Sequence, residues 1–140
     1  MATTTAAVTL TSDLLSDNMS VIADTICMKA GTTADGLDQM DMGYVEVATG
    51  TNFDLLDANN SGLNNSKANK VYICNESTDE TYYVIITIDS QAIGRLYAGD
   101  WMFIPWGSLD QHDDVEIQAY TGTNKIAYMF FHEGRTLVSA

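Results

Sequence analysis

The stretch TYYVIITI at residues 81–88 decides the fold class, because aromatic and β-branched residues, which favour strands, occupy every position. Alternation along a strand places Tyr83 and Ile85 on one face and Val84 and Ile86 on the other. Both faces are apolar, which is typical of a strand that is covered on two sides. We therefore expect one face to pack against a second sheet and the other against a neighbouring subunit.

Eight further segments on either side of this stretch show the composition or alternation of strands. They are residues 6–11, 19–28, 44–48, 71–75, 93–97, 101–104, 115–120 and 126–131. Turn residues separate many of them at intervals of about 8–12 residues, which is typical of a sandwich or barrel. The sequence therefore predicts an all-β fold, an antiparallel β-sandwich of about eight strands with a jelly-roll-like arrangement.

The connections between these segments carry their own predictions. The short polar segment 76–80 predicts a hairpin between residues 71–75 and 81–88. Residues 51–70 are rich in Asn and predict a long connection, with Phe53, Leu55 and Leu56 as its apolar anchor. Pro105 predicts the end of the strand before it, because proline has no N–H to donate to a ladder.

The charge balance excludes some classes of partner. Nineteen Asp and Glu residues against six Lys and Arg give a formal net charge of −13. Such a surface repels phosphate backbones and anionic lipids, so we expect neither a nucleic-acid nor a membrane partner. The 140 residues fit one domain. They hold no long apolar run and no signal-peptide pattern, so we expect a protein made in the cytoplasm.

Motifs of catalysis are missing from the sequence. It contains no nucleophile elbow and no HExxH pattern. His112 lies in an acidic segment and His132 follows a predicted strand, so both are expected to be surface histidines. A facing pair of carboxylates, as glycosidases use, is the enzymatic alternative. Most carboxylates fall in predicted turns, however, so we expect no enzyme and no cofactor.

One segment resembles half of a calcium loop. The run DANNSG at residues 57–62 matches the first six positions, with Asp57, Asn59 and Ser61 as the ligands. The twelfth position is Ala68, where such a loop needs a bidentate Glu. The sequence therefore predicts an ordinary Asn- and Gly-rich turn and no metal site, with a loose calcium site at those three residues as the alternative.

Two cysteines, Cys27 and Cys74, lie far apart in the chain and form no CxxC motif. A reducing compartment disfavours a disulfide between them. We expect two buried thiols that pack as small apolar side chains, with one disulfide as the alternative.

Aromatic residues gather around Pro105. Alternation places Trp101 and Phe103 on one face of their strand and the apolar Met102 and Ile104 on the other. This pattern favours a position in the core or in a subunit interface, where Trp and Tyr are common anchors. Exposed rings that stack on sugars, as in a carbohydrate-binding module, are the alternative.

Several stretches resemble small virion structural proteins of tailed phages that infect cyanobacteria and other marine bacteria. They are ANKVYICN at 68–75, IGRLYAGDWMFIPW at 93–106, a strand with Tyr128 and Met129, TLTSD at 9–13 and KAGT at 29–32. The resemblance covers about two-thirds of the chain and is densest from 68 to 131. It implies a virion component without catalytic activity.

Within that class, small acidic all-β proteins often decorate the head. The resemblance thus implies a capsid decoration (cement) protein on the virion head surface, acting as a homotrimer that bridges subunits of the major capsid protein. A tail or fibre component is the alternative. Residues 1–12 are expected to form a flexible arm and 13–140 a single sandwich domain. We expect Tyr97, Trp101, Phe103 and Trp106 to be core or interface anchors, with Arg95 a paired cation, buried or at an interface.

Overall fold

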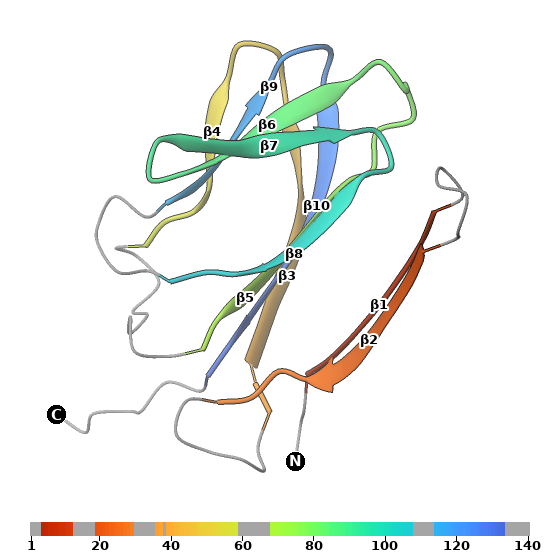
Figure 1. Cartoon of the computed structure of the whole chain (residues 1–140). Helices are drawn as coiled ribbons and strands as arrows, with labels where there is room; N and C mark the ends of the chain where they lie inside the picture. The colour runs from red at the N-terminus through yellow and green to blue at the C-terminus, as the bar shows by residue number, and fades with distance from the viewer. Residues whose placement is uncertain are drawn as a thin grey trace, which may run out of the picture.

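A computed structural model describes residues 4–12, 19–29, 36–37, 39–58, 68–107 and 114–133 of the chain. These residues form ten β-strands and no helix. Eight of the strands build two packed sheets, and the first two form a separate hairpin beside them (Figure 1). The all-β expectation from residues 81–88 is confirmed.

The strands follow one another along the chain with short connections between most of them. They are β1 (Thr5–Ser12), β2 (Met19–Ile26), β3 (Gln39–Val47), β4 (Asn52–Leu56), β5 (Lys70–Asn75), β6 (Tyr83–Ile88), β7 (Gln91–Tyr97), β8 (Trp101–Pro105), β9 (Val115–Ala119) and β10 (Asn124–His132).

The order of the strands is that of a jelly roll. One sheet has the order β3-β10-β5-β8 and the other has the order β4-β9-β6-β7, and all neighbours are antiparallel. The chain passes repeatedly from one sheet to the other, as the two Greek keys of a jelly roll require. The expected jelly-roll-like sandwich is therefore confirmed.

The core lies between the two sheets and follows the alternation read from the sequence. Every second residue of β5 and of β9 is buried, and the residues between them are half-buried. The centre contains Ile73, Ile86, Ile117 and Ile126, each at most 1% exposed. Burying a side chain of this size stabilises the fold by about 1.5–3 kcal/mol.

The predicted hairpin between residues 71–75 and 81–88 is wrong. Strand β5 belongs to one sheet and β6 to the other, so segment 76–82 crosses between the sheets. The hairpin partner of β6 is β7, and the turn between them contains Asp89 and Ser90 with φ of 50° and 59°. Two consecutive positive φ angles match the right-handed twist of the flanking strands.

Segment 51–70 also differs from the expectation of one long connection. Residues 52–56 form β4, which pairs with β9 through a register shift between Asp54 and Leu56. Only Leu55 of this strand is fully buried, so its alternation is weak. The strand ends before residues 59–67, which lie outside the described part of the chain.

The first two strands pair with each other and with neither sheet of the sandwich. The root of this hairpin is tied to the chain just before β3, because the Thr4 hydroxyl donates to the Leu37 carbonyl at 3.0 Å. The amide of Cys27 also donates to the Thr4 carbonyl. The boundary expected at residue 12 therefore falls inside a hairpin that extends to Ile26. Mobility of residues 1–12 in the free protein stays a prediction.

Candidate interaction surfaces

The outer side of the β3-β10-β5-β8 sheet is apolar across all four strands. Cross-strand register places Met42 opposite Met129, Met129 opposite Tyr72, and Tyr72 opposite Phe103. We call this surface the apolar face, and it comprises Met40, Met42, Tyr44, Tyr72, Trp101, Phe103, Met129 and Phe131. It turns away from the core, which lies on the opposite side of the same strands.

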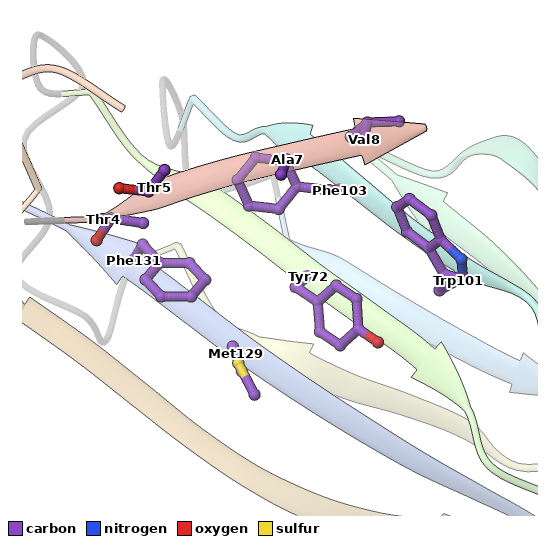
Figure 2. Close-up of a pocket in the computed structure, with 9 residues that line it drawn as sticks. All are labelled: Thr4, Thr5, Ala7, Val8, Tyr72, Trp101, Phe103, Met129 and Phe131. Atoms are coloured by element: carbon purple, nitrogen blue, oxygen red, sulfur yellow. The ribbon is translucent and has the colours of Figure 1, made fainter. Parts of the chain in front are cut away.

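Strand β1 passes over one half of the apolar face and leaves a cleft beneath it. Figure 2 shows Thr4 and three residues of β1, Thr5, Ala7 and Val8, above side chains of β5, β8 and β10. The cleft has a volume of about 380 Å³. Its floor is formed by Tyr72, Trp101, Phe103, Met129 and Phe131. The hairpin and the sheet therefore line the two sides of one cleft.

The aromatic rings of the apolar face contact one another, and some of them remain exposed to solvent. Tyr72 and Trp101 have ring centroids 6.3 Å apart, and Phe103 meets Phe131 edge-on. Trp101 is nevertheless 46% exposed, and Tyr44 on β3 is 60% exposed. Burial, followed by its hydrogen bond with Cys74, raises the pKa of the Tyr72 hydroxyl.

Lysine side chains border this face on two strands. Lys125 lies 4.8 Å from the Tyr44 ring centroid and 3.8 Å from the Glu76 carboxylate. Lys70 follows the same outward alternation on β5, opposite Pro105. In a chain with a net charge of −13, the apolar face is therefore bordered by two of the six cations.

A second group of aromatic side chains lies on the outer side of the β4-β9-β6-β7 sheet. Tyr83 contacts Tyr97 and stacks on Tyr120, with centroid distances of 5.0 and 5.6 Å. The guanidinium of Arg95 lies over the Tyr83 ring, 5.0 Å from its centroid. These four residues are called the tyrosine–arginine platform below. A hydrogen bond with the Tyr97 hydroxyl, followed by the field of Tyr83, raises the pKa of Arg95.

The predicted anchors therefore separate into three places. Trp106 is 2% exposed and packs edge-on against Phe130 in the core. Trp101 and Phe103 belong to the apolar face, whereas Tyr97 and Arg95 belong to the platform on the opposite sheet. Arg95 was expected to be a paired cation, either buried or at an interface. Its side chain is exposed, so it is not a buried cation.

Four carboxylates gather where β4 and β9 meet. Asp54 lies directly opposite Glu116, and Asp57 and Asp114 add further negative charge. The Asp114 carboxylate also accepts a hydrogen bond from the Ala58 amide at 2.8 Å. Of the calcium candidates, Asp57 belongs to this group, while Asn59 and Ser61 lie outside the described residues. The described His, Cys, Asp and Glu residues include no group that could hold a metal ion.

The expected surface position of His132 is wrong. Its side chain is buried, stacks on the Phe130 ring, and approaches the Glu133 carbonyl at 3.1 Å through Nδ1. Its Nε2 lies 3.3 Å from the Asp41 carboxylate. The inward alternation of β10 continues through His132, and the sequence signal was this spacing from Ile126 and Phe130. His112 lies outside the described residues.

Both cysteines are free thiols. Cys27 is buried at the root of the hairpin, as expected, whereas Cys74 is half-buried on β5. Cys74 lies opposite Trp101 on the outer side of its sheet, so it borders the apolar face and is not part of the core.

Sequence reasoning missed the outward residues of β3. Met40, Met42 and Tyr44 alternate with Asp41 and Gly43, and this period of two was visible in the sequence. The predicted strand covers only residues 44–48, which leaves both methionines outside it. The extension of β3 back to Gln39 brings them onto the apolar face.

Comparisons with known proteins add little to this geometry. No protein-family model matches the chain, and no curated protein sequence does so either. Among solved structures, a cupin protein from Bacteroides fragilis is 17% identical, with 72% of this chain and 70% of that one covered and a TM-score of 0.38. The described residues also contain no helix long and apolar enough to cross a membrane. At this identity and TM-score, the similarity to the cupin gives no information about the function of this chain.

Proposed function

We propose that this protein is a non-catalytic virion structural protein, a capsid decoration protein that docks onto the head shell through the apolar face. The observation that carries the proposal is the continuity of that face across four strands. Strand β1 passes over one half of it, yet Trp101 and Tyr44 remain about half exposed. Monomeric proteins rarely leave a large contiguous apolar patch in water unless another surface covers it.

The side chains of this face suit a protein partner. Interface centres are enriched in aromatic residues and Met and depleted in carboxylates. The described outward residues follow that composition, with Glu46 on β3 as the acidic exception. Covering exposed apolar area stabilises a complex by roughly 25 cal/mol per Å², less the entropy lost on association.

The net charge of −13 fits a component that is present in many copies. Charge of one sign keeps the free protein soluble by mutual repulsion. It also requires that any docking surface be locally free of carboxylates, because the repulsion acts on each approaching copy. The eight residues of the apolar face include no carboxylate, and at its border Lys125 lies beside both Glu46 and Glu76.

The test is co-sedimentation of the full-length protein with heads assembled from the major capsid protein of its phage. The unmodified protein is expected to pellet with the heads and to raise their melting temperature. Trp101→Ala is expected to weaken binding at least about tenfold, or ~1.4 kcal/mol. Met42→Glu places a charge among the exposed apolar side chains of the face, on β3, and is expected to abolish binding.

The matched control is Tyr120→Ala, which removes an equally exposed ring from the opposite sheet and is expected to bind heads normally. Binding to purified tails in place of heads would move the protein to the tail. Absence of binding to either particle would contradict the proposal. Light scattering on the free protein tests the homotrimer separately.

A further inference from the structure

The tyrosine–arginine platform is a second open surface, and docking through the apolar face does not use it. It lies on the outer side of the other sheet, so both surfaces can be occupied at once (Figure 1). Tyr97 is 41% exposed and Tyr120 is 51% exposed, and Arg95 is exposed beside them. Tyr83 is half-buried between the other two rings.

The platform combines ring faces, hydroxyl groups and one cation. An aromatic face attracts C–H groups through its negative quadrupole and removes their apolar side from water. Three phenol hydroxyls can donate and accept hydrogen bonds. The planar guanidinium pairs bidentately with a carboxylate. A pyranose ring that carries a carboxylate offers the matching groups: an axial C–H face, hydroxyls and one negative charge.

The local charge favours an anionic ligand despite the acidic chain. Arg95 is the only charged residue within β6 and β7, since neither strand contains a carboxylate. The contact with Tyr83 and the hydrogen bond to Tyr97 hold its guanidinium in place. The Asp100 carboxylate lies beside the platform, where it accepts a hydrogen bond from the Tyr97 amide at 2.9 Å and offsets part of the Arg95 charge. Repulsion from carboxylates farther than about 8 Å away is largely screened at physiological salt.

We propose that the tyrosine–arginine platform binds a glycan through a carboxylated sugar, with Tyr97 and Tyr120 stacking on the sugar ring and Arg95 pairing with its carboxylate. A densely charged polymer fits less well, because a single cation offsets one charge and the net charge of −13 opposes the rest. The ligand class is therefore a short glycan with acidic sugars, as opposed to a long polyanion. The open surface suits weak binding that becomes effective when many copies act together.

Nuclear magnetic resonance titration of the full-length, ¹⁵N-labelled protein tests this proposal and locates the site. The probes are trigalacturonic acid, its neutral galactose counterpart and a short Glu-containing peptide. We expect trigalacturonic acid at millimolar concentration to shift the Arg95 Nε–H signal and the amides of Tyr83, Tyr97 and Tyr120. The indole N–H of Trp101, on the opposite sheet, is expected to stay in place.

Two variants separate the parts of the site. Arg95→Gln is expected to weaken binding of trigalacturonic acid at least about tenfold, and to leave binding of the neutral sugar unchanged. Tyr120→Ala is expected to weaken binding of both sugars. Trp101→Ala is the control with an unchanged platform, and melting curves check that each variant folds.

Three outcomes would overturn the proposal. They are no shift with either sugar, equal shifts and affinities for the acidic and neutral sugars, and stronger binding of the Glu-containing peptide at the same residues. The last outcome would assign the platform to an acidic protein. Each of these leaves head binding through the apolar face untouched, so the two functions fail separately.

Discussion

The side-chain amides of Asn75 and Asn124 meet in the protein interior, where Asn75 Nδ2 donates to Asn124 Oδ1 at 3.0 Å. Both residues are fully buried. Asn75 Nδ2 also donates to the Leu96 carbonyl, and its Oδ1 accepts from the Ser77 amide. Asn75 is the residue at which the chain leaves one sheet for the other, so this pair fixes the crossing.

Asn75→Ala is expected to destabilise the protein by about 1–3 kcal/mol, because it removes the hydrogen bonds that Asn75 Nδ2 donates to Asn124 Oδ1 and to the Leu96 carbonyl. Urea unfolding followed by tryptophan fluorescence measures the loss. Asn52→Ala on the exposed face of β4 is the control, and its effect should stay within about 0.5 kcal/mol. Equal effects of the two substitutions would contradict a role for the buried pair.

The two tryptophans provide a second comparison. Trp106→Ala is expected to cost about 3–5 kcal/mol of unfolding free energy, because it empties a core site against Phe130. Trp101→Ala removes a half-exposed ring, so its loss of unfolding free energy should be less than about half of the loss for Trp106→Ala. Denaturant unfolding of both variants checks this order. If Trp101→Ala proved the more destabilising, Trp101 would have to be covered by the protein itself.

Asp54→Asn is expected to stabilise the protein at neutral pH. Partial desolvation, its hydrogen bond with Glu116 and repulsion from the same carboxylate raise the pKa of Asp54. A raised pKa means that the folded state binds the proton more tightly than the unfolded state does. Protonated Asp54 therefore contributes stability at low pH, and this contribution is lost as the pH rises through the folded pKa. The gain from removing the facing charges should be about 0.2–1 kcal/mol.

Thermal unfolding of Asp54→Asn and the unmodified protein at several pH values measures this effect. The difference should be largest near pH 7 and should disappear below the ordinary Asp value of 3.8. High salt should reduce it, because both carboxylates are near the surface. A constant difference across the pH range would rule out a charge effect.

Substitutions at Gly122 and Gly50 distinguish the backbone strain of an added side chain from its steric overlap with a neighbour. Both have positive φ, of 63° and 80°, but a Cβ at Gly122 would overlap the Tyr82 ring, whereas one at Gly50 would meet open space. Gly50→Ala is expected to cost about 1–2 kcal/mol from backbone strain alone. Gly122→Ala should lower the free energy of unfolding by clearly more than Gly50→Ala does. The melting temperatures of the two variants measure this difference.

The sequence predicted most strands but paired some of them wrongly. Residues 71–75 and 81–88 were read as a hairpin because they are adjacent in the chain and joined by a short polar segment. The buried amide of Asn75 was the sign that the segment crosses between sheets, yet an Asn at a strand end reads as an ordinary turn residue. The true hairpin turn, Asp89-Ser90, lacks the Gly that usually marks positive φ.

The candidate surfaces were predictable in part. Alternation identified Trp101 and Phe103 as members of one face. Continued past Pro105, the same alternation places Trp106 on the other face with Met102 and Ile104, and Trp106 does lie in the core. Tyr83, Tyr97 and Tyr120 come from three separate segments. Only the sheet order β9-β6-β7 brings their rings together, and that order is a property of the fold and not of any local pattern.

The outermost strands of the two sheets differ in how readily they could accept a strand from another molecule. Strand β4 is broken by its register shift, β7 by the irregularity opposite Ile86 and Thr87, and β8 ends at a proline with no N–H. Strand β3 runs for nine residues in unbroken register with β10. Fibre growth by strand addition, the common hazard of crowded β-proteins, is therefore obstructed at three borders of the sandwich and open only along β3.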